Sequence, residues 1–280
     1  MLEVNRNIEF LETISQGHRG ICFDETYKSY LTNKKVVTAL STITKKMGKK
    51  IDLLGLDACL MAMVEFGLLV NPYCDLMVAS QEVELGWGWN YATALSRFLH
   101  EPLTAENFAK EIVLSYQQAY KDITPDYTLS ACHLKKLNPV NDNISNIAQL
   151  LMECMALQLN NSARTVIQYC RSRKQCTSFE EPSYVDIGHF YKNLSEHCNK
   201  IQLPEDKQFV LSQLKQQLSE GLQLINQSVF AKANGKNLAK ATGLSIYFPL
   251  PTKQIHSSYL HSTFAKNNDW IKFLHRYLEK

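Results

Sequence analysis

An apolar run at residues 51–56, IDLLGL, constrains the fold of this chain more than any other segment. The run has the length of a buried strand and stops at Asp57. The residues after Cys59, LMAMVEFGLLV, show apolar spacing compatible with a helix that stops at Asn71 and Pro72. The sequence therefore predicts a strand, a sharp turn and a helix, with Cys59 at the turn.

Further strands and helices alternate along the first half of the chain. Residues 34–47 predict an amphipathic helix, and residues 74–80 and 128–134 predict two more buried strands. Strands that alternate with helices favour a largely parallel sheet with helices on both faces. We therefore expect an α/β fold whose mostly parallel sheet is flanked by helices, with sites at the carboxyl ends of the strands.

The second half of the chain has a different pattern. Apolar spacing from about residue 139 to residue 238 is almost wholly helical, and a strand at GLSIYFP and a final amphipathic helix follow. We expect three parts, which are a partial α/β core with the candidate site at 1–138, a helical region at 139–238, and a returning strand and helix at 239–280 that pack on the core.

Composition narrows the classes of function. The chain has 280 residues, 45% of them hydrophobic, with 30 basic and 27 acidic side chains and no long basic stripe, so nucleic acid is not expected as a partner. No apolar run approaches the roughly 18 residues of a membrane span, and the start of the sequence has no signal-peptide pattern. The sequence does not indicate a compartment.

The eight cysteines form no C-x-x-C pair, so the sequence supports neither a zinc ribbon nor a thioredoxin-type redox site. Most of them lie in apolar or helical surroundings, where a free cysteine behaves as a small core residue. The chain also lacks the ligand spacing of a metal-dependent hydrolase. We expect reduced thiols and no cofactor.

Cys59 is the exception among these thiols. A thiol just past a strand and at the first turn of a helix has its thiolate favoured by the positive end of the helix dipole. The alternative is a buried cysteine that merely packs between the sheet and the helix. Spacing alone does not separate the two interpretations.

A longer pattern around Cys59 is more specific. IDLLGLDACLMAMVEF followed by LMVASQEVELGWGWNY resembles the clostripain family of cysteine peptidases, whose pattern is an apolar strand, D-A-C-L-M, then S-E-E and G-x-G-W-x-Y. Later segments of the family also appear in order, namely TLSACHL, YVDIGHFYKNL, GLSIYFP and a final W-x-x-F-L-x-x-Y. The resemblance covers roughly residues 19–280 and implies a caspase-like fold with Cys59 as the nucleophile.

The general base is the first departure from the family pattern. Family members carry a histidine in an H-G motif upstream of the nucleophile strand, whereas the only histidine before Cys59 here is His18, in SQGHRG. His18 is the candidate base, and the alternative is an ordinary loop histidine. We also expect that the N-terminal strands are absent, that the chain is truncated, and that an upstream chain could complete the open sheet edge.

Substrate specificity is the second departure. The resemblance implies that a basic substrate side chain is held by two carboxylates, of which Asp57 matches the first, with helix capping as its alternative role. The second position aligns with Trp87, which has no charge but can receive a cation on its ring face. Three polar residues in SQEVE, Ser80, Glu82 and Glu84, are expected in a solvated loop, with the substrate cleft or calcium binding as alternatives.

Two functions remain open. The first is a clostripain-like cysteine endopeptidase that acts on peptide or protein substrates after Arg or Lys through the Cys59 thiolate. The second is a catalytically incompetent fragment or pseudoenzyme that binds peptides or proteins. Loss of the base leaves a fold largely intact, so the fold alone does not distinguish them.

Overall fold

The computed structural model of this chain describes residues 20–279 apart from 25, 28 and 101. The strands are β1 (Gly20–Asp24), β2 (Ser29–Thr32), β3 (Ile51–Gly55), β4 (Cys74–Ala79), β5 (Thr128–His133), β6 (Tyr184–Asp186), β7 (Val229–Asn234) and β8 (Ser245–Tyr247). The α-helices are α2 (Asn33–Met47), α3 (Val64–Val70), α4 (Tyr91–Leu95), α5 (Ala105–Tyr120), α6 (Leu137–Leu157), α7 (Ser162–Arg171), α8 (Ile187–His197), α9 (Phe209–Ser228), α10 (Ser257–Leu260), α11 (Thr263–Asn267) and α12 (Trp270–Leu278).

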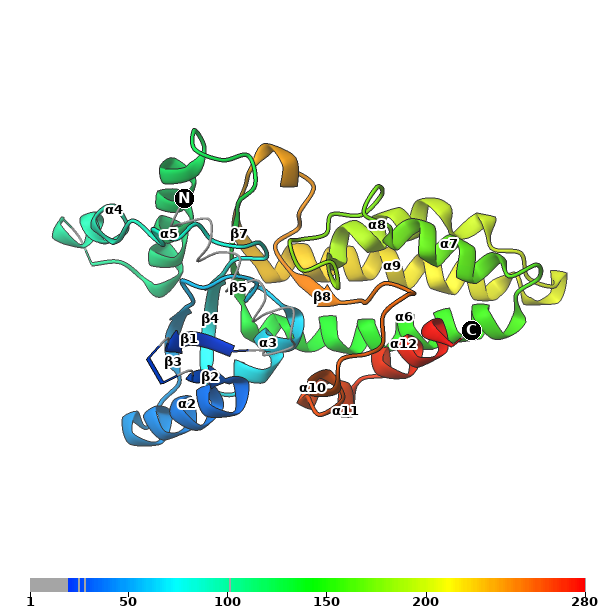
Figure 1. Cartoon of the computed structure of the whole chain (residues 1–280), viewed down its shortest axis with the longest axis horizontal. Coiled ribbons are helices and arrows are strands. Elements are labelled where there is room, and N and C mark those ends of the chain that lie inside the picture. The colour runs from blue at the N-terminus through cyan, green and yellow to red at the C-terminus, as the bar shows by residue number, and fades with distance from the viewer. Residues whose placement is uncertain (1–19, 25, 28, 101, 280) are drawn as a thin grey trace.

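The central sheet of the described residues has the strand order β3-β4-β5-β7 (Figure 1). β3 and β4 are parallel, but β5 is antiparallel to both β4 and β7. The α/β fold and the helical second half are confirmed. The predicted mostly parallel sheet is wrong, because the sheet is mixed.

The path between β4 and β5 explains the mixed sheet. Helix α5 begins near the carboxyl end of β5, where Glu106 lies 3.9 Å from His133, and its last residue, Tyr120, reaches the turn at Gly88 near the opposite end. The segment between β4 and α5, which contains the short helix α4, has therefore already carried the chain across the sheet before α5 begins. A side-chain pattern predicts where elements lie along the chain but not the direction in which a connection crosses the sheet, so the sequence could not reveal the crossing.

Of the last two strands of the chain, β7 was missed and β8 was predicted. The fourth strand of the central sheet, β7, lies within residues 139–238, which were expected to be helical, and it follows directly after the end of α9 at Ser228. The strand expected at GLSIYFP exists as β8, but it pairs antiparallel with β6 in a separate two-stranded sheet. A side-chain pattern predicts that a strand exists more readily than it predicts which other strand that strand pairs with.

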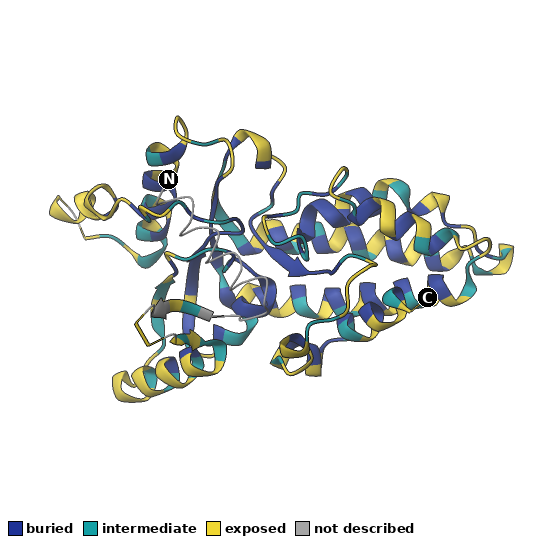
Figure 2. Cartoon of the chain, viewed as in Figure 1, coloured by how far each residue is buried: buried dark blue, intermediate teal, exposed yellow. Residues whose placement is uncertain are grey.

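The helical part extends away from the central sheet, with α6 and α9 packed side by side (Figure 1). Asn143 on α6 donates to the Gln217 carbonyl on α9, with a distance of 2.9 Å between nitrogen and oxygen. A β-carbon on Gly221 would lie 2.3 Å from the Asn143 side-chain oxygen, so the close approach of the two helices requires glycine there. Figure 2 shows buried inner faces and exposed outer faces on these helices. None of the helices that the structure describes could span a membrane.

Aromatic side chains fasten the end of the chain to the rest. The Trp270 indole nitrogen donates to the Tyr247 carbonyl over 2.8 Å, which links α12 to β8. The Phe248 ring packs edge-on against the Trp270 ring with 5.2 Å between centroids and also against Phe190 of α8. Burial of such rings, with edge-to-face contacts, is a large stabilising contribution.

A buried carboxylate joins three segments that lie far apart in the sequence. Asp186, fully buried at the end of β6, accepts hydrogen bonds from Gln81 Nε2 at 3.0 Å, the His189 amide at 2.7 Å and Thr242 Oγ1 at 2.7 Å, and also from the Thr242 amide. A buried carboxylate is costly unless such donors compensate for its lost hydration. We call this set of bonds the Asp186 brace.

Replacing Asp186 with alanine is expected to lower the free energy of unfolding by about 3 kcal/mol or more, because several buried donors lose their acceptor. Urea unfolding followed by circular dichroism measures the change. Asp122→Ala is the control, since the Asp122 side chain is 86% exposed and its loss should change stability by less than about 0.5 kcal/mol. Equally small effects of both substitutions would contradict the brace.

Candidate active site

The loop at residues 56–63, which we call the Cys59 loop, connects β3 to α3 and is held by backbone hydrogen bonds to three other segments. The bonds run from the Leu56 amide to Val78, from the Leu60 amide to Glu82, from the Ala62 amide to Ser80, and from the Ser245 amide to Ala62. Leu60 has a φ of 61°, a left-handed conformation that is strained for leucine. The hydrogen bonds on all sides keep this strained loop in place.

Cys59 does not lie at a helix N-terminus. Helix α3 begins at Val64, and the preceding Met63 pairs with Ser245 of β8, which keeps the chain extended until that point. The predicted dipole effect on the thiol is therefore wrong. Burial instead raises the pKa of Cys59 to about 11, although the Glu84 amide donates to its sulfur over 3.2 Å.

The SQEVE segment is buried, so the expectation of a solvated loop is wrong. Ser80 and Gln81 are fully buried, and Glu82 and Glu84 are nearly so. The Thr128 hydroxyl accepts from the amides of Gln81 and Glu82, and one Glu82 carboxyl oxygen accepts from the Val83 and Glu180 amides. These contacts fix the backbone that holds the Cys59 loop. In the part of the chain that the structure describes, no three His, Cys, Asp or Glu side chains are grouped to hold a metal ion.

Asp57 is enclosed by the turn at residues 86–89. One Asp57 carboxyl oxygen accepts from the Trp89 amide at 3.0 Å and from the Tyr91 hydroxyl at 2.8 Å. Gly88, with a φ of 62°, places its backbone so close that a β-carbon would lie 2.6 Å from the same oxygen. Asp57 does not cap α3, whose N-cap is Met63. The Asp57 residue remains exposed and its carboxylate is held in one orientation.

Glu84 lies beside Asp57 and is almost completely buried. Burial, together with the neighbouring Asp57 carboxylate, raises the pKa of Glu84 to about 9. Within the described residues, both Glu84 carboxyl oxygens, the Trp89 indole nitrogen and the Tyr116 hydroxyl are buried without a hydrogen-bond partner. Glu84 is therefore an acid that holds its proton at neutral pH.

The residues that the sequence predicted for the site lie in different places in the structure. Cys59 and Asp57 lie two residues apart in the Cys59 loop. The Trp87 residue is 71% exposed and belongs to the turn that encloses Asp57. His18 lies outside the described residues. Glu84 was noted only as a loop acid, because nothing in its spacing indicates contacts with both the thiol and Asp57.

Cys59 lines a cavity of about 1180 Å³. Apolar side chains of α3 and its surroundings form part of the wall, and two histidines, His256 and His261, also line it. His256 Nδ1 accepts from the Ser258 amide over 3.2 Å, so this ring caps α10. No sequence pattern indicated these histidines, since they lie in polar segments without a regular period.

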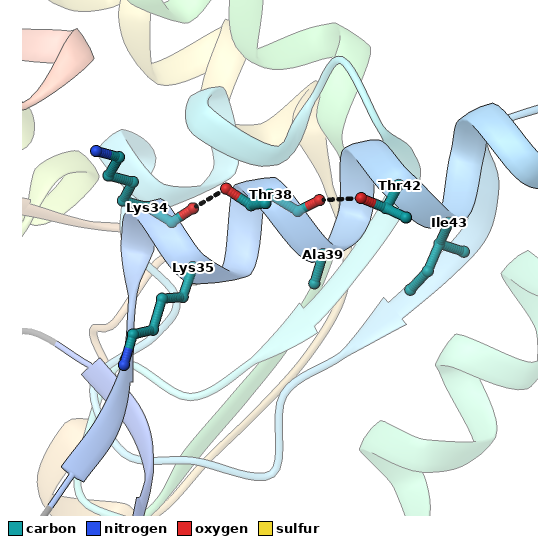
Figure 3. A pocket seen from close by; sticks show the side chains of 6 residues that line it. All are labelled: Lys34, Lys35, Thr38, Ala39, Thr42 and Ile43. Atoms are coloured by element: carbon teal, nitrogen blue, oxygen red, sulfur yellow. Dashed lines mark hydrogen bonds between the residues drawn. The ribbon is translucent and has the colours of Figure 1, made fainter.

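A second hollow lies on the outward face of α2 (Figure 3). The Thr38 hydroxyl donates to the Lys34 carbonyl and the Thr42 hydroxyl to the Thr38 carbonyl, both over 2.9 Å. These hydroxyls are therefore satisfied within the helix. The hollow is lined by residues of α2 alone and does not include Cys59.

Gly88→Ala is expected to lower the free energy of unfolding by about 1–2 kcal/mol, because alanine is strained at this φ and its β-carbon would displace Asp57. Gly86→Ala is the control, since a β-carbon at Gly86 meets no atom within 4 Å. Urea unfolding of both variants measures the difference. Comparable losses in the two variants would contradict the tight packing of the turn against Asp57.

The Glu84 carboxyl is expected to make stability depend on pH. Its pKa of about 9 in the folded chain exceeds its ordinary value of 4.5, so the folded state binds the extra proton between these values and the free energy of unfolding falls as pH rises. Glu84→Gln removes this contribution, so the variant should gain stability relative to wild type from pH 6 to pH 9. Exposed Glu153, changed to Gln, is the control. A difference that stays constant with pH would contradict the assignment.

Comparison with solved structures identifies the fold. The B. fragilis cysteine protease matches with a TM-score of 0.58 and 15% identity, covering 89% of this chain and 99% of that chain. A clostripain from Bacteroides thetaiotaomicron, in complex with the peptide inhibitor BTN-VLTK-AOMK, matches with a TM-score of 0.53 and 14% identity, covering 85% and 94%. An inactive zymogen C11 protease from Parabacteroides distasonis matches with a TM-score of 0.50 and 15% identity, covering 84% and 62%.

The family is identified from the sequence. A search of the curated proteins gives no match. The profile of the Clostripain family, Peptidase C11, matches residues 10–277, which is nearly the whole chain. This chain therefore belongs to the clostripain family of cysteine peptidases.

Proposed function

We propose that this chain is a cysteine endopeptidase that hydrolyses peptide bonds after Arg or Lys, with Cys59 as the nucleophile. The observation that carries the proposal is the position of Cys59 between a large cavity and a fixed, exposed carboxylate. Cys59 lines the cavity, and Asp57 lies two residues away with its carboxylate oriented by the turn at 86–89. The cavity receives part of the substrate backbone, and Asp57 receives the basic side chain.

The chemistry requires a thiolate at Cys59. Its sulfur bonds to the carbonyl carbon of the scissile peptide, the C–N bond breaks, and a protonated base delivers a proton to the leaving amine. Water then hydrolyses the thioester and restores the thiol. Because burial raises the Cys59 pKa to about 11, the base must remove the thiol proton when substrate binds.

Preference for a basic side chain rests on charge. The Asp57 carboxylate supplies the negative charge, and the exposed Trp87 ring supplies a face for a cation. The B. thetaiotaomicron clostripain is described in complex with the inhibitor BTN-VLTK-AOMK, whose peptide letters end in lysine. That complex supports the same substrate class for this chain.

Two sources of the base are compatible with the proposal. His18 is the histidine that precedes the thiol in the sequence. The other source is a separate upstream chain that pairs with β3, which is an edge strand of the central sheet among the described residues. Edge strands present backbone groups to which another strand can add.

A second candidate is a member of the family that binds peptides without cleaving them. The raised pKa of Cys59 favours it, because a thiol with a pKa of about 11 is not a nucleophile at neutral pH without a base. Such a protein would retain the cavity and Asp57. It would lack only the proton transfer.

The test is reaction of Cys59 with a peptidyl chloromethyl ketone that ends in arginine, compared with the same reagent ending in norleucine, from pH 5 to pH 9. Mass spectrometry locates the label in wild type, Cys59→Ala and His18→Ala. Cys22→Ala is the matched control, because the Cys22 residue is exposed. Active enzyme should label at Cys59 near pH 7, at least about tenfold faster with arginine, and normally in Cys22→Ala.

The His18 substitution identifies the base. A loss of about 100-fold or more in the Cys59 rate is expected if His18 removes the proton. An unchanged rate would assign the base elsewhere. A slow reaction that appears only at alkaline pH in wild type would sink the endopeptidase proposal and favour the peptide-binding candidate.

A further inference from the structure

The thiol lies between two different surroundings along the Cys59 loop. Asp57, two residues before Cys59, is exposed and is held by the turn at residues 86–89. Cys59 and the later loop residues Met61 and Met63 line the cavity of about 1180 Å³, which we call the Cys59 cavity. Neither Asp57 nor the turn is among the described residues that line this cavity. The carboxylate therefore precedes the thiol, and the cavity follows it.

This order indicates how a substrate peptide runs through the site. In a peptide, the scissile carbonyl carbon joins the α-carbon that carries the basic side chain to the nitrogen of the leaving amine. When that side chain lies at Asp57 and the carbonyl carbon lies at the Cys59 sulfur, the leaving residue continues past the sulfur and away from Asp57. The residue that follows the scissile bond therefore enters the Cys59 cavity.

Apolar side chains from three elements line the Cys59 cavity. They are Leu60, Met61 and Met63 of the Cys59 loop, Phe66 and Leu69 of α3, and Phe264 of α11. Most of them are buried, but Met61 and Leu69 are only partly buried, so part of their surface is open to a ligand. Covering apolar surface that water would otherwise contact is favourable. The cavity is therefore suited to a large apolar side chain.

The charged side chains of the Cys59 cavity do not favour a ligand of one sign. Among the described lining residues, Lys34 and Lys253 are basic, whereas Glu65 and Glu181 are acidic. Each of the two acids accepts a hydrogen bond from a backbone amide, over 2.8 Å and 2.9 Å respectively. Apolar contact therefore remains the main source of selectivity in this cavity.

We propose that the Cys59 cavity binds a large apolar side chain, such as leucine, of the residue that follows the scissile bond, and that Met61 contributes to this preference. The inference rests on the proposed preference for basic side chains, which places the peptide in this register. The flexible thioether of methionine adapts to apolar partners of different shape. The substrate class is thus a basic residue followed directly by a large apolar residue. The bond between the two breaks, and the leaving amine departs from the cavity.

The first test measures binding to the full chain with Cys59→Ala, which prevents turnover. Isothermal titration calorimetry at pH 7.5 compares acetyl-Ala-Ala-Arg-Leu-Ala-amide with the peptide that has alanine in place of leucine. Leucine after arginine should tighten binding by about tenfold, because its additional carbons leave water. Leucine placed before arginine, in acetyl-Ala-Leu-Arg-Ala-Ala-amide, should tighten binding by less than about twofold. An equal gain at both positions would overturn the proposed register.

The role of Met61 is tested with Met61→Gln, which keeps a similar length and introduces a polar group. The preference for leucine over alanine after arginine should fall to about twofold or less, since a polar amide loses hydration against the apolar side chain. Met47→Gln is the matched control, because Met47 is 49% exposed at the end of α2, outside the lining of the Cys59 cavity. An undiminished preference in Met61→Gln would contradict the role of Met61.

The location is tested on the same protein without any arginine. Leucyl-alanine-amide, which is the leaving side of the peptide alone, is added to protein with ¹³C-labelled methionine methyl groups. The Met61 and Met47 signals are identified by their loss in the two glutamine variants. The Met61 signal should shift and the Met47 signal should not. A Met61 signal that shifts no more than the Met47 signal would overturn the assignment of the cavity.

Failure of this inference differs from failure of the proposed function. A citrulline version of the leucine peptide measures the contribution of the basic side chain. Weaker binding of the citrulline peptide, without a preference for leucine after arginine, would overturn the role of the Cys59 cavity and leave the preference for basic side chains intact. Equal binding of the arginine and citrulline peptides would overturn that preference together with the register that depends on it.

Discussion

The Cys59 loop depends on a buried carboxylate that lies outside it. Asp186 accepts from the Gln81 side chain, and the neighbours of Gln81 along the chain, Ser80 and Glu82, accept the amides of the Cys59 loop through their carbonyls. The position of the thiol therefore follows from a hydrogen-bond acceptor at the end of β6, on another sheet. A strained left-handed residue next to Cys59 persists because this surrounding structure fixes it.

The acidic side chains near Cys59 raise the pKa of its thiol and therefore oppose its activation. Glu82 and Glu84 add negative charge beside a sulfur that is already mostly buried, and both disfavour the thiolate. Burial raises the pKa of both carboxyl groups as well, which reduces the charge that they place near the sulfur at neutral pH. At neutral pH, Glu84, with a pKa of about 9, therefore adds little charge beside the sulfur, and burial of Cys59 itself remains the main cause of its raised pKa.

The sequence predicts local features, such as the strands and helices themselves. It does not predict features that depend on the path of the chain between them. The spacing of apolar residues predicted β3, β4 and the long helices. The D-A-C-L-M pattern identified Cys59 and Asp57 as candidate site residues. The antiparallel direction of β5 was missed because the segment between β4 and α5 crosses the sheet, and a side-chain pattern does not give the direction of a connection. Burial of the SQEVE segment was missed because its partners, Thr128 and Asp186, are distant in sequence.

Gln81 departs from the family pattern, and its contacts in the folded chain explain why an amide suits this position. The family pattern has an acid there, whereas this chain has an amide. Gln81 donates through Nε2 to Asp186 and accepts the Gly243 amide through Oε1, so both ends of the amide are used. An ionised glutamate would place a second buried negative charge against Asp186 and provide no donor, which is costly. The amide therefore allows the single Asp186 carboxylate to hold the segment behind Cys59.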